Sequence, residues 1–171
     1  LSHLNMRKLI SGIEQSQQAQ LFISTHSDLI STRLDLRNCI LMNCAEPART
    51  VSLGFVEEDT AKFFMKAPDN NMLQFVLAKK VVLVEGDAEF ILMDAFCKKV
   101  LGHGLSEQGI DVIAVDGKCF KRYLEIAKQI GIKVAVVTDN DKNYAENITA
   151  SYRGYMNNEF ANIMVYADTD D

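Results

Sequence analysis

Two apolar segments of this sequence, residues 81–84 and 134–137, each run into a pair of acidic residues. The acids are Glu85 and Glu89 after the first segment and Asp139 and Asp141 after the second. In open parallel α/β sheets, ligands bind outside the carboxyl ends of the strands. Four carboxylates converging there would repel one another, and their hard oxygen atoms suit Mg²⁺ or Mn²⁺. The pattern predicts a divalent-cation site that can activate water and stabilise a leaving oxygen.

The spacing of the acids supports a shared site. Asp139 and Asp141 point to the same side of an extended segment, and a helix beginning after Glu85 stacks Glu89 on the same side as Glu85. Gly86 is expected to permit a tight turn between strand and helix. Each motif alone also fits a simpler interpretation, an ordinary turn or a helix N-terminus that favours acids. Their occurrence at equivalent ends of two strands favours the cation site.

The elements that must position these acids alternate regularly after Lys80. We predict strands at 81–84, 111–115 and 133–137, helices at 88–101 and 120–130, and a further strand within 161–166. A β-α-β-α-β order implies a parallel sheet with right-handed crossovers. The predicted fold class is therefore α/β.

The first part of the chain is organised differently. We predict a helix within 1–17, a short buried strand at 21–24 and a helix at 72–77. Strands at 38–43 and 50–56, with Pro47 in the turn between them, are expected to form a hairpin or a meander at a sheet edge. The polar segment 57–71, which contains Pro68, is expected to be a linker. We therefore place a domain boundary near residue 70, between units 1–70 and 71–171.

Composition excludes several classes of protein. The 171 residues are 48% apolar with a net charge of −5, and no apolar run approaches the roughly 18 residues of a membrane span. The four cysteines have no CxxC spacing, which favours reduced thiols in a cytoplasmic protein over zinc or disulfides. The sequence does not begin with Met, and we expect it to be a piece of a longer protein.

Residues 81–141 resemble a Toprim domain, the fold shared by topoisomerases, bacterial primases and several nucleases. That family has a strand ending in Glu-Gly and a later strand ending in Asp-x-Asp, here Glu85-Gly86 and Asp139-Asn140-Asp141. The resemblance implies that Glu85 is a metal ligand or general acid/base and that Asp139 and Asp141 are metal ligands. Glu89 is similar to the additional acid of OLD-family nucleases, whose Toprim site holds two metal ions.

The N-terminal segment adds a second resemblance. LFISTHSDLI is similar to the end of an ABC-type ATPase domain, in which the histidine, here His26, contacts the γ-phosphate of the nucleotide. LSHLNMRKLI resembles the helix after the acidic Walker B strand. An ATPase end followed by a Toprim domain is the layout of OLD-family endonucleases. Neither a GxxxxGK[ST] loop nor a Walker B acid is present, so ATP binding is expected only in the full-length protein.

The surroundings of the acids are less definite. Lys118 is predicted at the same sheet edge, where it could meet a phosphate or stabilise transition-state charge, although a surface role is the simpler interpretation. Asp116 could supply a ligand, and Lys142 could adjoin DNA or pair with an acid. The resemblance also implies a further acid and a basic residue after the last predicted strand. Asp168 and the acids at 170–171 are expected to be solvated.

These observations predict a metal-dependent DNA endonuclease with one or two Mg²⁺ or Mn²⁺ ions, regulated by ATP and homo-oligomeric in the intact protein. Three alternatives remain: topoisomerase or primase chemistry at the same acids, a non-catalytic DNA-docking or regulatory module, and a phospho-acceptor receiver domain. The ATPase-like segment argues against the first. The late position of the Asp-x-Asp motif argues against the last.

Overall fold

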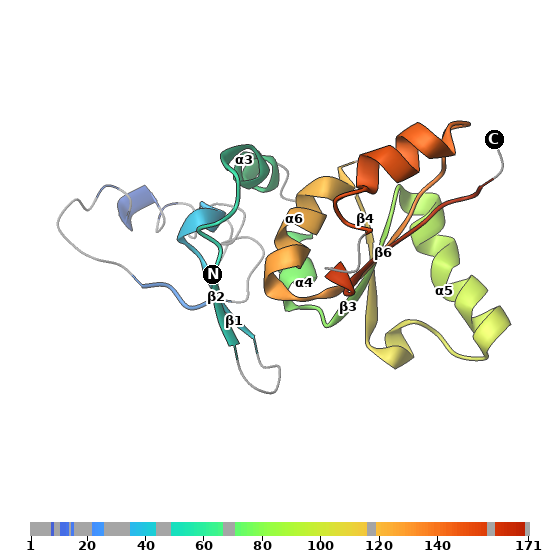
Figure 1. The fold of residues 1–171 in the computed structure, drawn as a ribbon. Coiled ribbons are helices and arrows are strands. Elements are labelled where there is room, and N and C mark those ends of the chain that lie inside the picture. The colour runs from blue at the N-terminus through green and yellow to red at the C-terminus, as the bar shows by residue number, and fades with distance from the viewer. Residues whose placement is uncertain are drawn as a thin grey trace.

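The protein is described by a computed structural model over residues 8, 11–13, 15, 22–25, 35–43, 49–66, 71–115, 119–156 and 160–169. Its largest unit is a four-stranded parallel sheet in the order β4-β3-β5-β6 (Figure 1). The strands are β3 (Lys80–Val84), β4 (Ile110–Ala114), β5 (Lys133–Val137) and β6 (Ile163–Tyr166). Helices flank the sheet, which confirms the predicted α/β class.

Two helices connect the first three strands of the sheet. α5 (Asp87–Leu101) joins β3 to β4, and α6 (Phe120–Ile130) joins β4 to β5. Right-handed crossovers running in opposite directions place their helices on opposite faces, as Figure 1 shows for α5 and α6. Each helix ends at a glycine with left-handed φ, 80° at Gly102 and 74° at Gly131, a conformation that glycine adopts without strain.

The strand order creates a crevice at one edge of the sheet. The chain leaves β3 toward β4 and later returns on the other side of β3 as β5. This reversal makes the carboxyl ends of β3 and β5 the topological switch point, where sheets of this kind bind ligands. Val84 pairs with Val137 in register, so both strands end at the same level. The residues that follow them are therefore neighbours.

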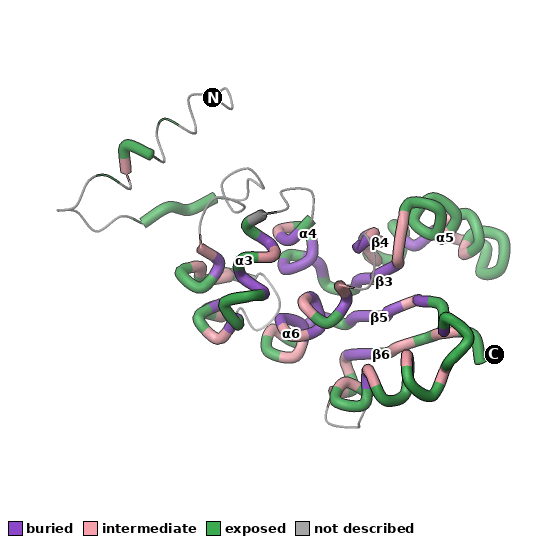
Figure 2. Tube along the Cα trace, turned by 90° about the horizontal axis from the view of Figure 1, so that it is seen from above, coloured by how far each residue is buried: buried purple, intermediate pink, exposed green. Residues whose placement is uncertain are grey.

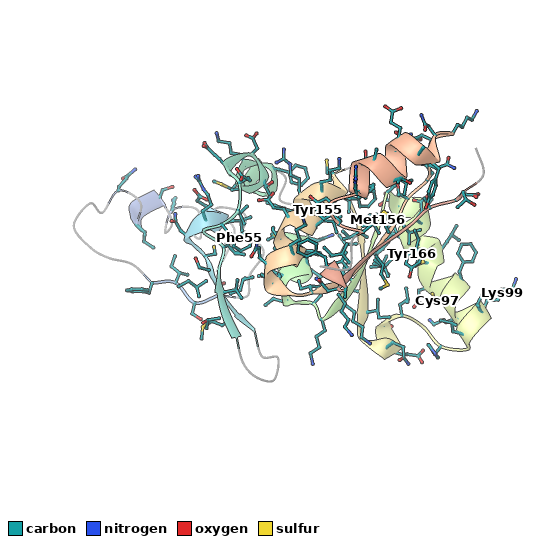
Figure 3. The ribbon with its side chains drawn as sticks, in the orientation of Figure 1. Phe55, Cys97, Lys99, Tyr155, Met156 and Tyr166 are labelled. Carbon is teal, nitrogen blue, oxygen red and sulfur yellow. The ribbon has the colours of Figure 1, made fainter. Side chains whose placement is uncertain are left out.

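The hydrophobic core involves α6 far more than α5. α6 buries Phe120, Tyr123, Leu124, Ile126 and Ala127. Alternate strand residues are also buried, as the two-residue period of a strand requires: Val81, Leu83, Ile113, Val134, Val136 and Ile163. α5 has no buried residue, although most of its side chains are apolar (Figure 2). In Figure 3, Lys99 of α5 points away from the sheet.

The hairpin predicted in the first part of the chain is confirmed. β1 (Ile40–Asn43) pairs antiparallel with β2 (Arg49–Ser52), and the short 3-10 helix η1 (Leu36–Asn38) precedes them. β2 ends earlier than expected, because the chain turns at residues 53–56 and buries Leu53 and Val56. The predicted helix α4 (Met72–Leu77) is also present, and η2 (Ser106–Gln108) precedes β4.

The expectation that residues 57–71 form a linker is wrong. Residues Glu58–Lys66 form helix α3, which buries Thr60, Ala61 and Phe64 on one face. The Phe64 ring meets the Tyr123 ring of α6 edge to face, with 5.0 Å between ring centroids. The acidic start and the nearby Pro68 hide this short amphipathic pattern in the sequence. The same buried cluster includes residues on both sides of position 70, and the domain boundary stays a prediction.

A carboxylate on α6 connects that helix to the N-terminal end of α3. Glu125 accepts hydrogen bonds from the Glu57 backbone amide at 2.8 Å and from the Thr60 hydroxyl at 2.6 Å. Arg122 donates to the same hydroxyl at 2.8 Å. The first amides of a helix lack partners within the helix, and a carboxylate satisfies them well.

We expect Glu125→Ala to lower the free energy of unfolding by about 2 kcal/mol, because two hydrogen bonds to a charged acceptor are lost. Urea denaturation measures this change. The matched control is Gln129→Ala, an exposed residue of the same helix, which should change stability by less than about 0.5 kcal/mol. Equal stabilities of the two variants would show that the link between α3 and α6 contributes nothing.

The predicted buried strand at 21–24 is not observed in those of its residues that the structure describes. Residues 22–25 are neither helical nor paired as a strand, and Phe22 is 83% exposed. An apolar run is buried only where a partner covers it, and the described part of the chain supplies none here. In the predicted helix at 1–17, residues 8 and 11–13 are helical. None of the helices in the described ranges is both long and apolar enough to cross a bilayer.

Candidate functional site

Glu85 lies at the switch point directly after β3. Its Oε1 accepts a hydrogen bond from the Thr138 hydroxyl and another from the Asp139 amide at 3.2 Å. Thr138 is buried and Glu85 is half-buried. The end of β5 therefore holds the carboxylate that follows β3. The structure brings Glu85 and the Asp139 backbone together, as the strand pattern predicts.

Glu89 is oriented toward the start of its own helix. Its Oε2 accepts from the Gly86 amide at 3.2 Å, as in a capping box, and acids in a first helical turn favour the helix dipole. Gly86 has φ −153° and ψ −171°, and an added Cβ would lie 3.6 Å from Glu89 Oε2, an ordinary contact. Gly86 therefore permits the turn between strand and helix, but the turn does not depend on a conformation that only glycine adopts. Residues with a side chain also adopt this backbone conformation.

The Asp-Asn-Asp segment leaves β5 as a turn instead of continuing extended. Asp139 and Asp141 are exposed and Asn140 is buried between them. Asp141 and Lys142 both adopt left-handed φ, 48° and 63°. Exposure of Asp139 and Asp141 on either side of the buried Asn140 fits the prediction that the two aspartates share one side, although the chain turns from Asp141 onward.

A third strand end also reaches this loop. The Thr138 amide donates to the Tyr166 carbonyl at 3.1 Å, and Asn140 Nδ2 donates to the Asp168 carbonyl at 2.9 Å. Asp168, exposed, follows β6 as Asp139 follows β5. This exposure agrees with the expectation that Asp168 is solvated. An acid after an apolar strand is nevertheless the same sequence pattern that marks the ends of β3 and β5.

A helical segment that the sequence analysis missed follows the acidic turn. Residues Ala145–Ala150 form the π-helix η3, which lies within a helical stretch from Tyr144 to Tyr152. Asn143 accepts from the Glu146 amide at 3.1 Å and donates to the Glu146 carboxylate at 2.9 Å. A capping residue three positions before a glutamate is a known sequence signature of a helix start.

Tyr152 is buried close to Glu85. Burial of the phenol, together with the negative charge of Glu85 and the neighbouring Tyr155, raises the pKa of Tyr152 to about 12. A phenol that holds its proton so firmly is a poor nucleophile. This argues against a covalent tyrosine mechanism at Tyr152. Tyr155 is half-buried, and the Lys128 ammonium lies 4.2 Å from the centroid of its ring.

The raised pKa of Tyr152 predicts a loss of stability in alkali. The folded chain binds this proton more tightly than the unfolded chain, whose phenol titrates near 10, so the free energy of unfolding falls as pH rises between about 10 and 12. Between about pH 9 and 11.5, the free energy of unfolding should fall by roughly 2 kcal/mol less in Tyr152→Phe than in the parent. Urea denaturation in EDTA measures this difference. Tyr166→Phe, a substitution at an exposed site, should show the same change in free energy of unfolding with pH as the parent. A Tyr152→Phe curve parallel to that of the parent would contradict the assignment.

The four predicted acids are brought to one end of the sheet but do not form a compact metal cluster. Among the described residues, no three His, Cys, Asp or Glu side chains are close enough together to hold an ion. The contact that links two of these acids is the hydrogen bond from the Asp139 amide to the Glu85 carboxylate. His26, Lys118 and Asp116 lie outside the described residues, so their predicted roles stay predictions.

The matched family agrees with this geometry. Residues 76–141 match the family model described as "Overcoming lysogenization defect protein-like, TOPRIM domain". This part of the chain is an OLD-like Toprim domain. The match begins within α4 and ends at Asp141, so the Toprim domain includes both acidic motifs. The resemblance to the OLD family is thereby confirmed for these residues.

Two curated relatives share sequence with the Toprim domain and its neighbours. The Old nuclease of Escherichia phage P2 is 28% identical over an alignment of 131 residues, which covers 71% of this chain and 22% of that protein. Endonuclease GajA of Bacillus cereus (strain VD045) is 27% identical over an alignment of 144 residues, which covers 81% of this chain and 24% of that protein. The chain thus spans less than a quarter of the length of these relatives.

A solved structure is also similar to this chain. The C-terminal region of the Xanthomonas campestris pv. campestris OLD protein is 26% identical and covers 54% of this chain and 51% of its own, with a TM-score of 0.39. The Toprim assignment rests on the family match and on the sheet described above.

Proposed function

We propose that this chain is part of a metal-dependent DNA endonuclease that hydrolyses phosphodiester bonds and is regulated by an ATPase domain in the intact protein. The observation that carries the proposal is the meeting of Glu85 and Asp139 at the switch point between β3 and β5. Two relatives bear the names of nucleases. DNA is therefore the proposed substrate.

The donor set at this edge suits a hard divalent cation. Mg²⁺ is commonly held by one or two carboxylates, with water and substrate phosphates completing its shell, so a compact cluster of protein ligands is not required. Glu85, Asp139 and Asp141 would hold the first ion, and Glu89 would join them for a second by exchanging its bond to the Gly86 amide. When bound, Mg²⁺ or Mn²⁺ lowers the pKa of the attacking water and stabilises the leaving oxygen.

The chain's own residues supply the orientation that this chemistry needs. The Thr138 hydroxyl and the Asp139 amide fix one oxygen of Glu85, which keeps that carboxylate at the strand end in one direction. Lys142 is exposed directly after the acids and would approach a DNA phosphate. Lys118 is proposed to stabilise transition-state charge from the β4 side.

The proposed regulation by ATP rests on the sequence of the first segment. His26 would contact the γ-phosphate, and residues 1–70 would be the end of an ABC-type ATPase domain whose nucleotide is bound only in the intact protein. We also propose that the intact protein is a homo-oligomer.

Two observations favour a second function, that of a DNA-docking or regulatory module without catalysis. Glu89 caps its own helix, and the described acids form no cluster of three. Incubation of the intact protein with supercoiled plasmid and Mn²⁺ separates the two functions. Nicked or linear DNA is expected for the endonuclease and should disappear in EDTA. Binding of DNA without cleavage under all metal conditions would favour the docking module and overturn the endonuclease.

A further inference from the structure

Asn140 is the one residue of the acidic turn whose side chain points into the protein. It is 6% exposed, whereas Asp139 and Asp141 on either side are exposed. A buried amide must satisfy its donors and acceptor within the fold. Its Nδ2 donates to the Asp168 carbonyl at 2.9 Å, and its Oδ1 accepts from the Lys142 amide at 2.7 Å. The side chain therefore joins the turn after β5 to the segment after β6.

The bond to Lys142 explains how the turn keeps its shape. Asp141 and Lys142 are consecutive residues in the left-handed region, which side chains other than glycine adopt rarely. An asparagine side chain that accepts from the amide two residues later forms an Asx turn, which stabilises such a local reversal. Without this acceptor, the direction in which Asp141 leaves the sheet edge is no longer fixed.

The backbone carbonyl of Asn140 is also hydrogen-bonded within the fold. The Asn140 carbonyl accepts from Asn147 Nδ2 at 2.9 Å and from the Asn143 amide at 3.0 Å. Asn140 is thus bonded to the segment after β6, to its own turn and to η3. Neither of its hydrogen-bonding side-chain atoms points outward with the flanking aspartates. Asn140 lies between two proposed metal ligands, so it would influence a bound cation by orienting them and not by touching the cation.

We propose that Asn140 is a positioning residue that sets the affinity of the site for a divalent cation, by fixing the turn that carries Asp139 and Asp141 against the end of β6. The proposal rests on the proposed function, since it requires that these acids hold the cation. Residues that orient metal ligands without touching the metal commonly change its affinity about 10–100-fold when they are substituted.

The test measures Mn²⁺ binding to the intact protein without DNA, by isothermal titration calorimetry. Asn140→Ala should raise the Kd for Mn²⁺ about 10–100-fold. Asn140→Ser should have a smaller effect, because a hydroxyl can still accept from the Lys142 amide. The matched control is Asn143→Ala, at an exposed asparagine of the same loop. Its side chain bonds to Glu146, and alanine keeps the backbone amide that donates to the Asn140 carbonyl. Its Kd should stay that of the parent.

A second readout separates positioning from plain stabilisation. Mn²⁺ raises the Tm of a protein that binds it only when folded, by an amount that depends on affinity. A positioning role predicts that Asn140→Ala reduces this Mn²⁺-induced rise. A purely structural role predicts a lower Tm with the same rise, and that result would overturn the proposal.

Each remaining outcome is also decisive. If Asn140→Ala does not fold, the Kd of Asn140→Ser decides: a raised Kd supports the proposal and a parental Kd rejects it. If the parent binds Mn²⁺ and Asn140→Ala binds it equally well, only the role of Asn140 is rejected. If the parent itself binds no Mn²⁺, the proposed metal-dependent function fails and the role of Asn140 fails with it.

Discussion

Asp139→Asn is expected to reduce Mn²⁺-dependent cleavage of DNA by about 10²–10³-fold, a loss of the size seen when one preorganised charge-stabilising group is removed from an active site. The substitution replaces one carboxylate oxygen by an amide of the same shape. It keeps the Asp139 backbone amide that donates to Glu85, so the arrangement of the two strand ends survives. The lost activity would then reflect the missing negative charge at the proposed metal site.

The control for this variant is Glu146→Gln. Glu146 is an exposed acid of the helical stretch just after the turn, and its side chain accepts from Asn143. Removing its charge should leave plasmid cleavage at the level of the parent. Cleavage rates are measured over a range of Mn²⁺ concentrations, with unfolding curves confirming that both variants are folded. Undiminished cleavage by Asp139→Asn would reject Asp139 as a metal ligand.

The second large effect is on stability. Tyr123→Ala is expected to lower the free energy of unfolding by about 3–5 kcal/mol, the usual cost of deleting a buried aromatic side chain. Tyr123 is 0% exposed, and its ring meets the rings of Phe64 and Phe75 edge to face at 5.0 and 5.1 Å. The substitution therefore removes contacts among α3, α4 and α6 at once, and the cavity it leaves cannot close without moving three helices.

Tyr166→Ala provides the matched control for that stability loss. Tyr166 is 55% exposed on β6, so its removal should cost about 1 kcal/mol or less. Urea denaturation of both variants gives the comparison. A loss at Tyr123 no larger than that at Tyr166 would mean that α3 and α4 do not share a core with α6.

The sequence predicts the sheet well because its signals are local. Apolar runs of four to five residues alternate with helical patterns, and the glycines at 102 and 131 mark the ends of both crossover helices. The sequence predicts α3 poorly, because the few residues that this helix buries are separated by charged residues and the segment therefore resembles a polar linker. The strand predicted at 21–24 fails over its described residues for the opposite reason. Phe22 and Ile23 are apolar but exposed, because burial depends on a covering partner and not on composition.

The sequence by itself determined that acids follow two strands of one parallel sheet and that those strands belong to a Toprim domain. Residue type and spacing carry that information. Only the tertiary structure decided how the acids are held. Glu85 is fixed by the end of β5, and Asn140 fastens the acidic turn to the segment after β6. These two contacts join residues 54 and 28 positions apart in the chain, and strand order sets them, which no local pattern encodes. Glu89 is held differently, by the Gly86 amide three residues before it at the start of its own helix.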